Sequence, residues 1–95
     1  IMRKKFDREL LADVAERLIN HLQTRTDVQN IDLMNLSGFC RNCLSKWYLD
    51  AAEKKNITLD INQSRELIYG MPYDDWKTKH QKEATKKQLE DFKNK

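Results

Sequence analysis

The chain has 95 residues, of which 39% are hydrophobic and 35% are charged, and its formal net charge is +3. This length predicts one domain, residues 1–95, with one modest core. Two glycines and one proline are too few for the turns of a β-sandwich or barrel, and no apolar run is long enough for a membrane span or a secretory signal. With two cysteines and no signal sequence, we expect a reducing, cytoplasmic location and no membrane partner.

The positive charge is confined to the end of the chain. Residues 1–76 hold 11 Lys and Arg against 12 Asp and Glu, whereas residues 77–95 hold 7 against 3. Such a tail suggests either self-association or contact with nucleic acid. Mixed Lys and Glu positions are more typical of a solvent-exposed helix face, so nucleic acid is the less favoured partner.

Hydrophobic periodicity predicts that the chain opens with two helices. The first covers residues 3–25, and its apolar stripe consists of Phe6, Leu10, Leu11, Val14, Leu18 and Leu22. The second covers about residues 27–36 and begins at a capping box formed by Thr26 to Gln29. Its apolar residues point all round the axis, which predicts that neighbouring helices enclose it.

The remaining elements are also predicted to be helical. A third helix over about residues 38–55, with Ser37 as its N-cap, has an apolar face made of Cys40, Cys43, Leu44, Trp47 and Ala51, with Arg41, Asn42, Ser45 and Glu53 opposite. A fourth runs from the cap Asp60 to Tyr69, and Gly70 ends it. A fifth begins at Pro72, and residues 81–95 follow as a charged helical tail. The expected fold is a compact all-α bundle of four to five helices with the short second helix enclosed.

Residues 17–45 contain no lysine and no glutamate, although the chain has 12 and 6 of them. Arginine, aspartate and asparagine, which make fixed and directional hydrogen bonds, are retained there. The stretch therefore predicts a partly buried polar network of Arg25, Asp27, Asp32, Asn35, Arg41 and Asn42. Two interpretations stay open: the network ties the first three helices together, or it lines a binding site.

The pair Cys40 and Cys43 allows three interpretations. The two thiols pack as small apolar groups; or, with His21 and His80, they form a site for zinc or another divalent metal; or they form a redox pair in which the helix dipole lowers the pKa of Cys40. No phosphate loop, metalloprotease motif or nucleophile elbow occurs, which favours a non-enzymatic protein.

The segment from Gly38 to Tyr48, with residues 27–37 before it, resembles the signature of a small bacterial family of domains of unknown function. A later block, Tyr69 to Tyr73 with Trp76, His80 and Gln81, is similar to the same family. The resemblance covers about residues 17–85, leaves the tail after Ala84 outside, and implies a short helical protein without an assigned activity.

The function that follows is a non-enzymatic binding or interaction module with a Cys/His metal site. The alternatives are a small thiol-dependent redox protein that uses Cys40 and Cys43, and a homo-oligomeric or nucleic-acid-contacting module that uses the basic tail.

Overall fold

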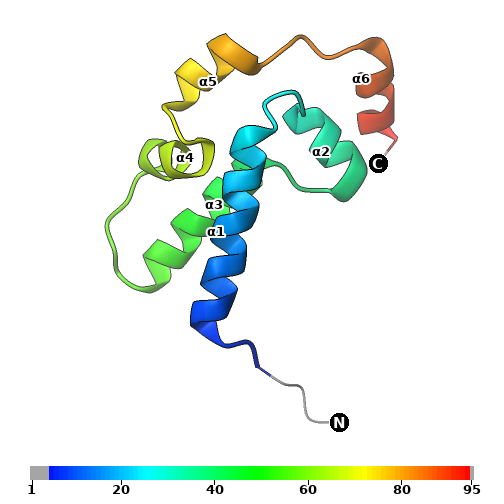
Figure 1. Ribbon diagram of the computed structural model, residues 1–95. Helices are drawn as coiled ribbons and strands as arrows, with labels where there is room; N and C mark the ends of the chain where they lie inside the picture. The colour runs from blue at the N-terminus through cyan, green and yellow to red at the C-terminus, as the bar shows by residue number, and fades with distance from the viewer. Residues whose placement is uncertain (1–4, 95) are drawn as a thin grey trace.

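The computed structural model describes residues 5–94, which form helices and, within that range, no strand (Figure 1). The helices are α1 (Arg8–Thr24), α2 (Asn30–Ser37), α3 (Arg41–Lys54), α4 (Ile61–Tyr69), α5 (Tyr73–His80) and α6 (Lys86–Lys93). The all-helical prediction is confirmed. Residues 3 and 4 of the expected first helix and residue 95 of the expected tail lie outside the described residues. No helix in the described part of the chain has the length and apolar character needed to cross a membrane.

Side chains in the sequence fix most of the helix ends. The carboxylate of Asp7 accepts hydrogen bonds from the backbone nitrogens of Glu9 and Leu10 at the start of α1. Asp60 and Gln63 form a capping box at α4, as expected from Asp60, and Gly70 ends that helix in the left-handed conformation.

Two helix starts differ from the prediction. The capping box of α2 is made by Gln29 and Asp32 rather than by Thr26 to Gln29, so α2 begins later. The N-cap of α3 is Cys40 rather than Ser37. The loop before α2 is longer than expected, because the carbonyls of Arg25 and Val28 accept hydrogen bonds from a side chain of α3 that is described below.

Helices α3 and α4 form the most extensive helix pair. Ser45 and Ser64 lie at their contact and are fully buried. The hydroxyl of Ser64 donates to the carbonyl of Ser45, and the hydroxyl of Ser45 donates to the carbonyl of Arg41. Small side chains whose hydroxyls are bonded to backbone allow the two helices to approach closely without leaving a buried polar group unpaired.

A small apolar core lies where α4 and α5 meet. Its buried members are Ile68, Tyr69 and Trp76, and partly buried Ile19, Leu44, Met71 and Tyr73 pack against them. The ring of Tyr69 lies 5.1 Å from that of Tyr73 and 5.1 Å from that of Trp76. Trp76 is only 1% exposed, so aromatic contacts dominate this core.

The prediction that the second helix is enclosed is wrong. No residue of α2 is buried, and Leu36 is 86% exposed. Helix α2 lies to one side of the molecule, where α6 is the helix packed against it (Figure 1). Most residues of α2 are half-buried, so its all-round apolar pattern does not reflect a central position in the molecule.

The predicted inner faces of the first and third helices are also wrong. Of the six residues predicted to form the apolar face of the first helix, only Leu22 is buried. On α3 the buried residues are Arg41, Ser45 and Ala52, whereas Trp47 is 56% exposed. Part of the predicted face is nevertheless covered, because Cys40 is buried and Leu44 packs against the core. Arg41 and Ser45 were expected to face water and are buried because they donate hydrogen bonds to backbone carbonyls.

The two glycines both end a helix in the left-handed (αL) conformation, but they differ in how much space surrounds them. Gly38 and Gly70 have φ of +78° and +77°, but a Cβ on Gly38 would meet nothing within 4 Å, whereas one on Gly70 would lie 2.9 Å from the side chain of Gln23. That side chain donates to the carbonyls of Leu67 and Ile68.

Gly38→Ala should therefore lower the free energy of unfolding by about 1 kcal/mol through backbone strain alone. Gly70→Ala should lower it by about 1 kcal/mol more, because the bonds of Gln23 are displaced. Urea unfolding of both variants measures this, and equal losses would contradict it.

Candidate functional site

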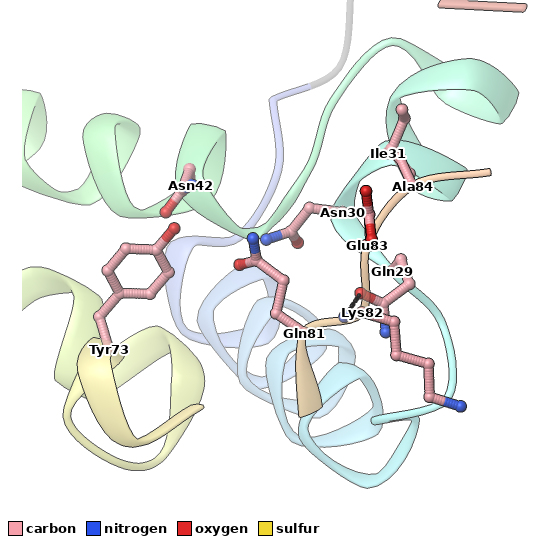
Figure 2. Close-up of a pocket in the computed structure, with 9 residues that line it drawn as sticks. All are labelled: Gln29, Asn30, Ile31, Asn42, Tyr73, Gln81, Lys82, Glu83 and Ala84. Atoms are coloured by element: carbon pink, nitrogen blue, oxygen red, sulfur yellow. Dashed lines mark hydrogen bonds between the residues drawn. The ribbon is translucent and has the colours of Figure 1, made fainter. Parts of the chain in front are cut away.

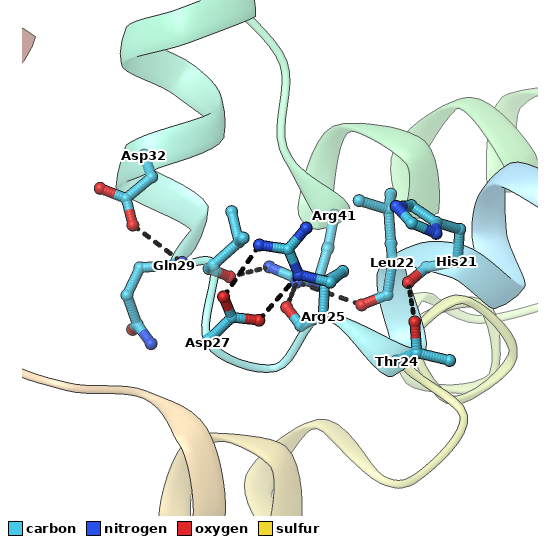
Figure 3. Close-up of polar contacts among 9 residues, drawn as sticks. His21, Leu22, Thr24, Arg25, Asp27, Gln29, Asp32 and Arg41 are labelled. Carbon is cyan, nitrogen blue, oxygen red and sulfur yellow. Dashed lines mark hydrogen bonds and ion pairs between the residues drawn. The ribbon is translucent and has the colours of Figure 1, made fainter.

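Arg41, the first residue of α3, is 1% exposed. Its Nη1 donates to the carbonyl of Val28 at 2.8 Å and to Oδ1 of Asn30 at 3.1 Å. Its Nη2 donates to the carbonyls of Leu22 at 3.2 Å and Arg25 at 2.8 Å. Figure 3 shows this guanidinium surrounded by the end of α1 and the loop that leads to α2.

These acceptors lie at the end of α1 and in the loop that follows it. The carbonyls at the end of a helix carry partial negative charge. Those of Leu22 and Arg25 each accept one backbone hydrogen bond, from the nitrogens of Arg25 and Val28, and the guanidinium of Arg41 adds a second. One guanidinium fork therefore holds α1, the following loop and α3 together. The Cζ atom of Arg41 also lies 4.9 Å from the ring centroid of Trp76, which joins the same group to the aromatic core.

No carboxylate among the described residues bonds to this buried cation. Burial lowers the pKa of Arg41, and Tyr69, Cys40 and Asp27 oppose that shift. Because a guanidinium keeps its proton in proteins, a positive charge persists inside the molecule, balanced mainly by carbonyl dipoles.

Arg41 also sets the direction of a chain of hydrogen bonds. Arginine can only donate, so Oδ1 of Asn30 must be an acceptor and its Nδ2 a donor. That Nδ2 donates to the hydroxyl of Tyr69 at 3.1 Å, and the hydroxyl donates to Oδ1 of Asn42 at 2.8 Å. Burial raises the pKa of Tyr69, so its hydroxyl keeps the proton that the chain needs.

The chain ends on a free donor group. Since Oδ1 of Asn42 accepts from Tyr69, the NH₂ end of the same planar amide is turned away from Tyr69. It donates to no other described residue. Hydrogen bonds in series polarise one another, so this NH₂ group is a strengthened donor.

Asn42 lines a pocket of about 300 Å³ between α2, α3, α5 and the segment before α6. Its walls are Gln29, Asn30, Ile31, Asn42, Tyr73, Gln81, Lys82, Glu83 and Ala84. In Figure 2 the amide of Gln81 points between Asn30 and Asn42. It makes no hydrogen bond with the described residues.

Gln29 holds the outer wall of this pocket in place. It is 8% exposed, its Nε2 donates to the carbonyl of His80 at 2.8 Å, and its Oε1 accepts from the backbone nitrogen of Lys82 at 2.9 Å. The single amide therefore fixes the chain on both sides of Gln81.

The rest of the predicted polar network lies elsewhere. Oδ1 of Asp32 accepts from Nε2 of Gln88 at 2.7 Å, and Nδ2 of Asn35 donates to the carbonyl of Gln88 at 3.1 Å, so these two residues attach α6 to α2. Arg25 and Asp27 form an exposed ion pair at 2.9 Å. Only Arg41 and Asn42 of the six predicted residues belong to the pocket and its hydrogen-bond chain.

The four predicted metal ligands are not brought together. The sulfurs of Cys40 and Cys43 lie 3.9 Å apart as free thiols. His21 is exposed on α1, and the ring of His80 packs 5.7 Å from that of Trp76. Within residues 5–94, no three His, Cys, Asp or Glu side chains are grouped so that they could hold a metal ion.

The surroundings of Cys40 do not favour the third interpretation, in which the helix dipole lowers the pKa of its thiol. Cys40 is the N-cap of α3 and is 7% exposed. Burial raises the pKa of its thiol, and hydrogen bonds from the backbone of Cys43 and Asn42 offset only part of that shift. A thiol of this kind is less nucleophilic than an ordinary one.

Sequence reasoning did not assign the roles of Gln29, Asn30 and Tyr69. Asn30 lies within the stretch that excludes lysine and glutamate, so a signal for it was present. Tyr69 appeared only as the end of a helix. Its contacts with Asn30 and Asn42 span 39 and 27 positions of the chain, a distance over which helical periodicity carries no information.

The fold and site define a small all-helical domain in which a buried arginine joins three segments beside an amide-lined pocket. Residues 28–94 match the family described as a protein of unknown function, DUF1244, and the chain belongs to that family. The match includes the tail after Ala84, which the earlier resemblance left outside. No curated protein matches the chain.

Arg41→Lys should lower the free energy of unfolding by roughly 2–4 kcal/mol, because one ammonium group cannot reach four acceptors in the fork geometry and loses several hydrogen bonds to buried oxygen atoms. Urea unfolding followed by circular dichroism measures the loss. Arg25→Lys, at an exposed position, is the control and should leave unfolding unchanged. A small loss for Arg41→Lys would contradict the role of Arg41 in holding α1, the following loop and α3 together.

The thiols should differ in reactivity. Because burial raises the pKa of Cys40, its thiolate fraction is below that of an ordinary cysteine at pH 8 and keeps rising at higher pH. Iodoacetamide followed by peptide mass spectrometry should modify Cys43 before Cys40, with the difference shrinking as pH increases. Faster modification of Cys40 than of Cys43 at neutral pH would contradict this prediction and support the redox interpretation.

Proposed function

We propose that this protein is a non-enzymatic binding module whose ligand occupies the pocket beside Asn42, and that this ligand is a small molecule bearing a carboxylate. The observation that carries the proposal is the hydrogen-bond chain from Arg41 through Asn30 and Tyr69, which leaves the NH₂ group of Asn42 as a polarised donor at the pocket wall.

The electrostatics favour a negatively charged acceptor. Lys82 and Glu83 at the pocket wall carry opposite charges, so neither sign prevails at the rim. The buried charge of Arg41 has no acidic partner bonded to it, and its effect extends along the chain of bonds toward Asn42. A carboxylate oxygen accepts from such a donor more strongly than a neutral oxygen does.

The composition of the pocket supports binding over catalysis. Its wall contains amides, one tyrosine, one lysine and one glutamate, and no cysteine, serine or histidine. Four of the nine wall residues are amides, which orient a ligand but do not serve as nucleophiles or general bases at neutral pH. The groups that could transfer a proton are Tyr73, Lys82 and Glu83, and of these Lys82 and Glu83 are exposed to solvent.

The pocket is also better supported than the other functions predicted from the sequence. A metal site needs further ligands beside the two thiols, and the described residues group none there. A redox pair needs a nucleophilic thiol, whereas burial raises the pKa of Cys40. The basic tail forms α6, which is packed on α2.

Titration of ¹⁵N-labelled protein with acetate, succinate or glutamate tests the proposal by NMR. At least one of these carboxylates should shift the side-chain NH₂ resonances of Asn42 and Gln81 to saturation, because both amides donate to the bound oxygen atoms. Sodium chloride at matched ionic strength should not produce the shift.

Asn42→Asp is the sharpest variant. It keeps an oxygen to accept from Tyr69, removes the donor, and adds a like charge, so the carboxylate-dependent shift at Gln81 should disappear. Asn62→Asp adds the same charge at an exposed position of α4 and should leave the shift intact. Unaltered binding by Asn42→Asp would refute the proposal.

A further inference from the structure

One face of α1, together with Phe6 just before the helix, exposes a row of large apolar side chains. Phe6 is 79% exposed, Leu10 and Val14 are 65% exposed, and Leu11 and Leu18 are 44% exposed. We call these five residues the α1 stripe. Together they present about 500 Å² of apolar surface, at the upper end of what monomeric proteins leave open.

The stripe lies on a part of α1 that its own chain covers little. Every residue from Arg8 to Leu18 is exposed, and burial begins only at Ile19 and Leu22. Another side of this segment borders α3 and α4, where Ala12 and Ala15 line a cavity with Tyr48 and Leu67. In Figure 1 the N-terminal end of α1 reaches slightly past the other helices. Helices of this length are marginal in water unless an apolar face is packed, so the stripe requires a covering surface.

We propose that the α1 stripe packs against the α1 stripe of a second copy of this chain, with the two helices antiparallel about a two-fold axis near Val14. In that arrangement each Leu10 lies opposite Leu18 of the other copy, and the two Val14 side chains meet at the axis. A two-fold contact uses the same patch on both chains, which suits a single continuous stripe.

The charges beside the stripe favour a second copy over a partner of one sign. Asp13 and Arg17 lie on the same edge, one helical turn apart, and neither is paired within the described part of the chain, where the ion pairs are Arg25–Asp27 and Lys77–Asp74. An antiparallel copy places each Asp13 beside the other chain's Arg17, so the two pairs form reciprocally.

The available area is sufficient for such a contact. A stable interface buries about 800 Å² on each partner. The stripe supplies most of that, and the flanking side chains Asp13, Ala15 and Arg17 supply the remainder. No residue of α1 lines the pocket beside Asn42, so self-association and ligand binding can be tested independently.

Sedimentation equilibrium of the full chain across a range of concentrations tests the dimer. The expected mass is twice the chain mass of 11.4 kDa. Val14→Lys places two like charges at the axis and should weaken dimerisation by about a hundredfold or more. Leu36→Lys, at an even more exposed apolar residue on α2, should not change it. A wild-type chain that remains monomeric at about 100 μM would overturn the proposal.

Charge exchange tests the antiparallel arrangement. Asp13→Arg should raise the dissociation constant by roughly threefold to tenfold, since it turns two attractive pairs into repulsive ones. Adding Arg17→Asp in the same chain should restore the wild-type constant. Because both positions are exposed, circular dichroism should show native helix content in each variant. A dimer that Asp13→Arg leaves unweakened, or that the double variant fails to restore, would exclude this geometry.

Discussion

The structure depends on the buried guanidinium of Arg41. It reaches four oxygen atoms from α1, from the loop before α2 and from Asn30, and it packs on Trp76. Three of the acceptors are backbone carbonyls, and those of Leu22 and Arg25 also accept one backbone hydrogen bond each. A single side chain therefore adds hydrogen bonds to the turn between α1 and α2, and it does so from the first turn of another helix.

This arrangement explains how a chain with so few buried apolar side chains holds its shape. The core contains two aromatic residues and one isoleucine fully buried, and the contact between α3 and α4 is made by two serines whose hydroxyls bond to backbone. Buried hydrogen bonds favour one packing arrangement, because another would leave more buried donors or acceptors unpaired. Nε of Arg41 has no partner, but its Nη1 and Nη2 donate to four oxygen atoms. Arg41, Gln29 and the two serines thus specify how the helices are placed, while the aromatic cluster supplies burial.

The same network separates the molecule into regions with different roles. Beside Arg41, directional hydrogen bonds leave the amide of Asn42 facing a pocket, which supports a ligand with a fixed orientation. On the first half of α1, an apolar stripe is exposed, which suits association through shape and area. The family has no assigned function, and these two surfaces are where binding is expected.

The sequence by itself determined the helical class, the caps at Asp60 and Gly70, and the stretch from residue 17 to 45 in which a polar network lies, because these depend on local propensity and composition. It did not determine which side of each helix is buried. Periodicity finds an apolar face on α1 and α3, but in the structure Arg41 and Ser45 are buried, whereas Leu10 and Trp47 are exposed. The pocket likewise follows from contacts of Asn30 and Asn42 with Tyr69 across long stretches of chain. Only the tertiary structure decided these features, since the free energy of satisfying buried carbonyls outweighs the preference of any single helix face.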